Sequence, residues 1–166
     1  MSYHIYTTRG IVLAGRAVRE ADRIYSILTR DLGLIRATAL GVRKGSSKLR
    51  GALEPLMLSS ISLVRGKEFW RVTSAEAIQK IHSWRGVVRP LDLLEKLVQG
   101  EAPHPELFDA VEKNVITPRT DDEMFEIRFV SQILFHLGYL KESDLTQDKK
   151  ALIKAINEGL QHSHLT

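Results

Sequence analysis

The chain contains no cysteine, and only 7% of its 166 residues are aromatic. Without cysteine it can form neither a disulfide nor a thiolate zinc site, which is compatible with the reducing cytosol. No apolar run approaches the roughly 18 residues that a membrane-spanning helix needs. Residues 1–6 show no basic region followed by an apolar core, so no signal peptide is expected. We therefore expect a soluble cytoplasmic protein with no membrane partner.

Motifs typical of catalysis are also missing. The stretch from Gly41 to Lys48 is rich in glycine and serine, but it lacks the spacing and the Gly-Lys-Ser/Thr ending of a Walker A loop. No Gly-x-Ser-x-Gly motif is present, and nothing places the two serines of that stretch beside a base. Among six scattered histidines only His162 and His164 lie close together, which is too few ligands for a zinc site. We expect no enzyme activity, no metal and no cofactor.

Charge is distributed unevenly along a chain of otherwise ordinary globular composition. Residues 1–80 hold 14 Lys and Arg against 6 Asp and Glu, whereas residues 81–166 hold 10 against 14. A basic first half favours nucleic acid or an acidic protein surface as partner. The second half is typical of a helical body or a partner surface.

The densest cluster of cations lies in the stretch from Ile35 to Leu53, which has no acidic residue. It begins like a strand, because small or apolar residues alternate with polar ones, and it breaks into a loop at Gly41. Four cations on a loop with glycines and serines form a flexible surface that can follow a polyanion. We predict that this loop contacts nucleic-acid phosphate.

Strand-like runs separated by turn residues fill the first half of the chain. The predicted strands are 11–18, 23–30, 34–42, 56–64 and 69–75. Asp31-Leu32-Gly33 and Arg65-Gly66-Lys67 are typical of tight hairpin turns. Five strands in about 70 residues suit a small, partly open barrel, so we predict an OB-fold over residues 1–79.

The apolar period changes to that of helices in residues 80–166. Pro90 is placed for the first position of one helix, and His104-Pro105 for the opening of a second. A capping box at Thr120–Glu123 opens a third, central helix that ends at Gly138, and Asp148 caps a fourth. The segment that begins at Leu140 is expected to connect directly to that last helix, with no element between them. The predicted class is α+β, a five-stranded OB-fold barrel followed by an α-helical domain.

Further cations fall on or beside the other predicted strands, where a barrel would bring them onto one groove. Single-strand binders add aromatic rings that stack on bases, and Tyr25, Phe69 and Trp70 are the rings available. Because neighbours on a strand point to opposite faces, either Phe69 or Trp70 must point inward. The predicted DNA-binding residues are Arg16, Arg23, Arg36, Arg43, Lys44, Lys48, Arg50 and Arg71.

Several segments carry a family resemblance. The segments 10–13, 21–44 and 47–56, followed by 125–130 and 137–140, together resemble the RecO family of bacterial recombination mediators. The resemblance implies binding to single- and double-stranded DNA, annealing of complementary strands, and recombinase loading with RecR onto strands coated by single-strand-binding protein. It also implies a nucleoid-associated place in the cytoplasm.

The sequence departs from many RecO proteins in two ways. They carry a four-cysteine zinc module shortly after the Leu-Gly-Tyr segment, and this chain has none, so the resemblance is to a short form without the metal. The helical domain is also shorter. We predict a non-enzymatic DNA-binding mediator. The alternative is an interaction scaffold whose basic barrel docks an acidic protein tail.

Overall fold

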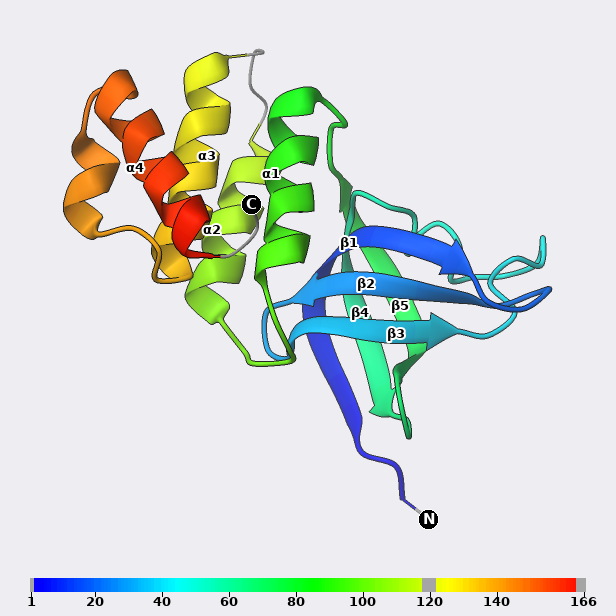
Figure 1. Ribbon diagram of the computed structural model, residues 1–166. Helices are drawn as coiled ribbons and strands as arrows, with labels where there is room; N and C mark the ends of the chain where they lie inside the picture. Colours follow the sequence, from blue (N-terminus) through cyan, green and yellow to red (C-terminus); the bar gives the residue numbers. More distant parts are fainter. Residues whose placement is uncertain (1, 118–121, 164–166) are drawn as a thin grey trace. The chain divides into compact units, whose positions relative to one another are not determined.

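Strands and helices occupy separate parts of the chain. The computed structural model describes residues 2–117 and 122–163. They divide into two compact units: residues up to Ile81 with Gly100–Pro105, and His82–Gln99 with residues from Glu106 onward. All the described strands belong to the first unit, and the second is helical (Figure 1). The predicted α+β class is confirmed.

The strands close into a five-stranded barrel in the order β1-β2-β3-β5-β4, with β1 also paired to β4. β3 and β5 run parallel and share only a short register, and this pairing closes the barrel where the sequence predicts a partly open one. The strands are β1 Ile5–Ala17, β2 Arg23–Thr29, β3 Gly33–Ala39, β4 Met57–Arg65 and β5 Trp70–Lys80.

β1 and β5 are longer than predicted, because pairing extends them beyond their alternating patterns. β1 begins at Ile5 rather than Ile11, since its largely exposed first residues pair with β4. At Gly10, β1 pairs with both β2 and β4. A Cβ there would stand 2.8 Å from Ile27 and 3.0 Å from Ile61, so glycine allows the strand to turn tightly around the barrel core.

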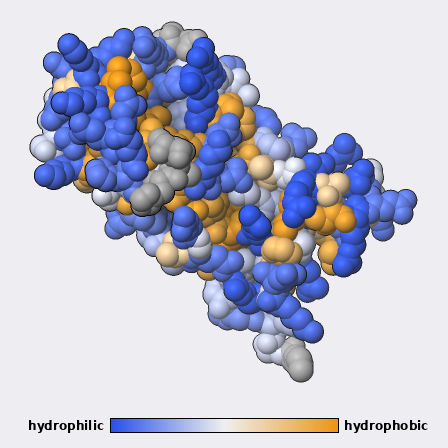
Figure 2. Space-filling view, viewed as in Figure 1, coloured by the Kyte–Doolittle hydropathy of each residue, from blue (hydrophilic) through white to orange (hydrophobic). Residues whose placement is uncertain are grey.

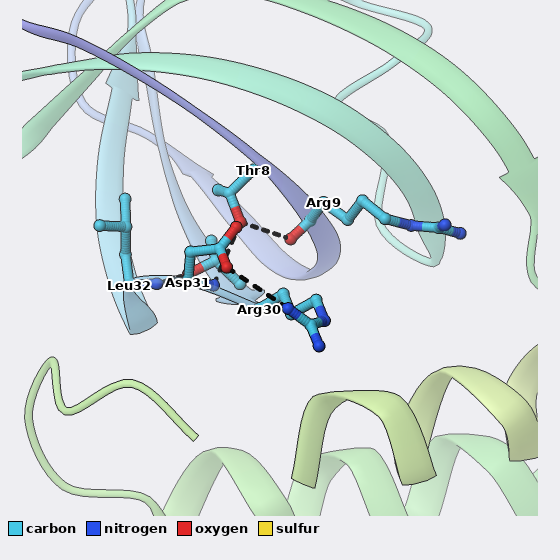
Figure 3. A network of polar contacts seen from close by, with 6 residues as sticks. Thr8, Arg9, Arg30, Asp31 and Leu32 are labelled. Atoms are coloured by element: carbon cyan, nitrogen blue, oxygen red, sulfur yellow. Dashed lines mark hydrogen bonds and ion pairs between the residues drawn. The ribbon is translucent and has the colours of Figure 1, made fainter. Parts of the chain in front are cut away.

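The β2–β3 hairpin turn is held by a network of polar contacts (Figure 3). The buried Thr29 hydroxyl donates to the Gly33 carbonyl over 2.7 Å and accepts from the Leu32 amide over 3.1 Å. The Asp31 amide donates to the Thr8 hydroxyl over 3.2 Å, which joins the turn to β1. Gly33 has φ +76°, the left-handed conformation expected of it in this turn.

The helical unit contains α1 Arg85–Leu97, α2 Pro105–Ile116, α3 Glu123–His136, the 3-10 helix η1 Glu142–Thr146 and α4 Lys149–His162. α3 packs against α1 and α4, as expected of a central helix. Asp122 and Asp148 cap α3 and α4 by accepting from Met124 and Ala151 amides. Thr120 and Asp121 of the predicted capping box lie outside the described residues. None of the helices described is long and apolar enough to cross a membrane.

Two helix predictions are wrong. Pro90 does not begin α1 but lies inside it, because the helix starts at Arg85 and buries Pro90 with Val87 and Leu91. That packing outweighs the one backbone hydrogen bond that proline cannot donate. The segment after Leu140 forms η1 before α4 begins. η1 has no apolar period to reveal it, and the Asp144 carboxylate that accepts from the Lys141 amide stabilises its start.

Candidate nucleic-acid interface

Strand alternation places two of the predicted arginines, Arg36 and Arg71, outside the barrel. On β3, Ile35 and Ala37 are buried in the core and Arg36 between them is exposed. On β5, Trp70 and Val72 are buried and Arg71 is exposed. The alternating direction of side chains therefore points both arginines to the outer face.

The register aligns Arg16 with Arg71 across that face. Arg16 pairs with Ile24 of β2, Ile24 with Thr38 of β3, and Thr38 with Arg71 of β5. Three strand spacings separate the two arginines, on the order of 14 Å. Arg36 lies one row away, paired with Ser26. We call Arg16, Arg36 and Arg71 the outer-face arginines.

The loop after β3 carries the four clustered cations, and all of them are exposed. Its backbone is attached to the β1–β2 turn: the Gly41 amide donates to Asp22 Oδ1 over 2.7 Å, and the Arg43 amide to the Ala21 carbonyl over 3.0 Å. The Arg43 guanidinium also donates to the Arg19 carbonyl over 3.2 Å. These hydrogen bonds attach the loop to the β1–β2 turn and position Arg43 and its neighbours beside it.

Arg23 differs from the other predicted residues because it is only half-exposed. It pairs with Ala17 and the buried Ala39, and its Nη2 donates to the Gly15 carbonyl over 3.1 Å. Together with Arg43 and Arg50 it lines a cavity of about 460 Å³. The other lining residues are Tyr25, Val42, Leu53, Glu54 and Pro55. We call Arg23, Arg43 and Arg50 the cavity arginines.

The eight predicted residues thus form three sets and not the single groove expected from the sequence. The outer-face arginines extend from the strands, the cavity arginines surround a pocket, and Lys44 and Lys48 stand on the loop. Alternation explains the division, because Arg23 shares the inward register of Tyr25 while Arg16 and Arg36 have the opposite one. Figure 2 shows hydrophilic side chains over most of the visible barrel surface, with small apolar areas between them.

Two of the three candidate stacking rings belong to the barrel core. Tyr25 is 4% exposed and Trp70 is 6% exposed, so neither offers a face to a base. Trp70 packs edge-on against Tyr6 at 5.3 Å, and the Arg65 guanidinium lies 4.9 Å from its ring centre. Of the Phe69–Trp70 pair, the tryptophan is the one that points inward. Burial raises the pKa of the Tyr25 hydroxyl, against the opposing effect of the Arg23 and Arg50 charges.

Two further exposed cations lie on the turns that border the outer face. Arg19, between β1 and β2, was missed by sequence reasoning, and Lys67, between β4 and β5, is one of the further cations beside the predicted strands. In OB-folds these two connections flank the oligonucleotide-binding face. Their position between the first two and the last two predicted strands was the signal that could have placed both among the predicted DNA-binding residues.

Within residues 2–117 and 122–163, no three His, Cys, Asp or Glu side chains are grouped so that they could hold a metal ion.

A closed five-stranded barrel in this strand order, with arginines on its outer face, defines the chain's first unit as an OB-fold domain. The family model described as "Recombination protein O N terminal" matches residues 1–81, and through this domain the chain belongs to the RecO family of DNA repair proteins.

Relatives named DNA repair protein RecO extend the similarity beyond the barrel. The one from Dehalococcoides mccartyi strain BAV1 is 38% identical over 112 residues, which cover 63% of this chain and 44% of the relative. The one from Gloeothece citriformis is 30% identical over 148 residues, 80% of this chain and 50% of the relative. The one from Synechococcus sp. is 44% identical over 81 residues, 49% of this chain and 28% of the relative. The chain spans at most about half the length of these relatives.

Proposed function

We propose that this chain is a DNA-binding recombination mediator without catalytic activity of its own. It binds single- and double-stranded DNA, anneals complementary strands, and assists recombinase loading together with RecR on strands coated by single-strand-binding protein. The observation that carries the proposal is the set of outer-face arginines on an OB-fold barrel, flanked by a loop with four exposed cations.

Electrostatics supplies the mechanism. Two complementary strands repel each other through their phosphates, and cations that contact those phosphates release condensed counterions and reduce the repulsion. Arg16 and Arg71 are far enough apart to contact different phosphates, and the loop cations can reach others. The protein holds both backbones, and base pairing supplies the sequence specificity.

The two units have different roles in this proposal. The barrel unit, which contains residues up to Ile81, is the DNA-binding domain, and the helical unit is available to partner proteins. RecR and single-strand-binding protein are proposed as partners from family membership. The net negative charge of residues 81–166 suits a protein contact better than a DNA contact.

Annealing of two complementary fluorescent oligonucleotides, with and without single-strand-binding protein, tests the proposal. We expect the chain to accelerate annealing in both conditions. DNA binding without acceleration would reduce the chain to a binding module. An anisotropy titration with a labelled acidic peptide runs in parallel, and tight peptide binding without DNA binding at physiological salt would favour the scaffold instead.

A further inference from the structure

The cavity beside β2 has a strong excess of positive charge. Its arginines come from three separate segments: Arg23 from β2, Arg43 from the loop after β3, and Arg50 from the turns before β4. Glu54 is the acidic residue among its lining residues, and its carboxylate lies 3.6 Å from Lys80 Nζ. Because the Glu54 carboxylate is also paired with Lys80, it does not balance the charges of the three guanidiniums that line the cavity.

These guanidiniums have unused hydrogen-bonding capacity. Arg23 Nε is buried and has no acceptor among the residues that the structure describes. A buried donor without an acceptor costs free energy, and such a group calls for a ligand or an ordered water. Arg50 likewise makes no ion pair with a described residue. Several N–H groups around the cavity are therefore available to an anion.

The cavity also has an apolar side and enough room for more than an inorganic ion. Tyr25, Val42 and Leu53 form buried walls. Its volume of about 460 Å³ lies within the usual range for small-molecule sites. The Tyr25 hydroxyl is protonated at neutral pH, as any tyrosine is, and can donate to a phosphate oxygen.

A cavity in the helical unit differs from the barrel cavity in the balance of its charges. It measures about 630 Å³ and its charged lining residues are two arginines and two glutamates. Arg89 and Glu126 form an ion pair at 3.5 Å, so the charges balance locally. The barrel cavity therefore has an excess of positive charge that the cavity of the helical unit does not have.

We propose that the barrel cavity binds the terminal phosphate of a DNA strand; this inference rests on the proposed DNA binding. A terminal phosphomonoester carries between −1.5 and −2 charges near neutral pH, whereas a phosphodiester within a strand carries one. Three arginines converging from three segments match the higher charge and can contact its oxygens from several directions. An annealing protein that holds strand ends would align partners from their termini.

Anisotropy titrations of one oligonucleotide, prepared with a 5′-phosphate, a 3′-phosphate or hydroxyls at both ends, test the inference. We expect one phosphorylated form to bind about tenfold more tightly than the hydroxyl form, the effect of one hydrogen bond to a charged group. Equal affinity for all three would overturn the inference and leave DNA binding intact. Failure of every form to bind would contradict the proposed function itself.

Free deoxyadenosine monophosphate separates a strand end from a free nucleotide. We expect it to compete weakly, because it lacks the phosphates that contact the other cations. Competition as strong as that of the phosphorylated oligonucleotide would overturn the assignment to a strand end.

Arg50→Gln tests the residue assignment, because Arg50 is exposed and its change should leave the barrel folded. It should abolish the preference for the phosphorylated end, measured as the ratio of the affinities of the phosphorylated and hydroxyl forms, a ratio in which any general phosphate contact of Arg50 cancels. Arg128→Gln, an exposed arginine on α3, is the matched control and should retain the full preference. A preference unchanged in Arg50→Gln would exclude this cavity as the site.

Discussion

The Gly41 amide donates a 2.7 Å hydrogen bond to Asp22 Oδ1, and this contact joins the β1–β2 turn to the loop after β3. Gly41 has φ +66°, so the loop leaves β3 in a conformation that few other residues adopt easily. The same turn receives the Arg43 amide and guanidinium. One carboxylate therefore helps to position both the cationic loop and the rim of the cavity.

Replacing this carboxylate should loosen the loop. Asp22→Ala removes the acceptor, and we expect it to lower the free energy of unfolding by about 1–2 kcal/mol. Asp22→Asn keeps an oxygen that can accept from Gly41, and it should lose less than half as much. Urea unfolding of the three proteins measures the difference, and equal losses in both variants would show that the hydrogen bond is not the cause.

Salt dependence distinguishes the loop from the outer face. Changing Arg43, Lys44, Lys48 and Arg50 together to alanine should flatten the plot of log K against log salt by about three units, at about 0.7 per lost contact on single strands. The triple change of the outer-face arginines should flatten it by about two. Anisotropy titrations from low to moderate salt give these slopes.

A change of three charges elsewhere, equal in number to the outer-face triple change, controls for the loss of net positive charge. Lys113, Lys150 and Lys154 are exposed on α2 and α4, and changing them together to alanine should leave the slope nearly unchanged. If the loop variant keeps the wild-type slope, its cations do not contact phosphate. If the lysine control flattens the slope equally, net charge alone explains the effect.

The Thr29 hydroxyl is expected to contribute strongly to barrel stability. It is buried and makes two hydrogen bonds within the β2–β3 turn, to Gly33 and Leu32. Thr29→Val keeps the shape but leaves both partners unsatisfied, so we expect a loss of about 2–3 kcal/mol. Thr29→Ser retains the hydroxyl and should lose less. Thermal unfolding followed by circular dichroism compares them, and a valine variant as stable as the serine one would refute this role.

Trp70 should be insensitive to bound DNA, because it lies in the core of the barrel. Trp84→Phe leaves Trp70 as the single tryptophan and keeps a ring beside Phe125, which Trp84 contacts at 5.1 Å. We expect Trp70 emission to resist acrylamide and to change little when a saturating oligonucleotide is added. Strong quenching by DNA would mean that a base stacks on Trp70 after all.

The barrel could be predicted because its strands follow a simple physical rule. A strand with one buried face alternates apolar and polar residues, and β3 does so from Ile35 to Ala39. Gly33 marks its turn by the positive φ that glycine allows. Pattern alone could not show the first part of β1, whose exposed residues from Ile5 onward are ordered by pairing with β4.

The division of the candidate site could not be predicted, because it depends on register. Arg23 and Arg16 look alike in the sequence, but β1–β2 pairing gives them opposite directions. An irregularity between Val12 and Ala14 shifts this register, and a local sequence pattern does not reveal such a bulge. Tyr25 and Trp70 were ambiguous for the same reason, since only closure of the barrel decides which ring is inside.

The buried Tyr25 hydroxyl gives the barrel a measurable response to high pH. Burial raises its pKa above the ordinary 10.0, because the charged phenolate is poorly solvated in the core. In the unfolded chain the hydroxyl loses its proton near 10, whereas the folded chain still holds it, so the unfolded state binds fewer protons. Stability is therefore fully present below pH 10 and falls as the pH rises through the interval up to the folded pKa.

Tyr25→Phe removes this titration and keeps the ring against Gly15. We expect wild type and variant to lose stability differently between pH 9 and 11: the wild type should fall more steeply, since lysines titrate equally in both. Urea unfolding at several pH values in this interval measures both curves. Parallel curves would show that the Tyr25 hydroxyl has the same pKa in the folded and unfolded states, and a steeper fall in the variant would reverse the sign of the shift.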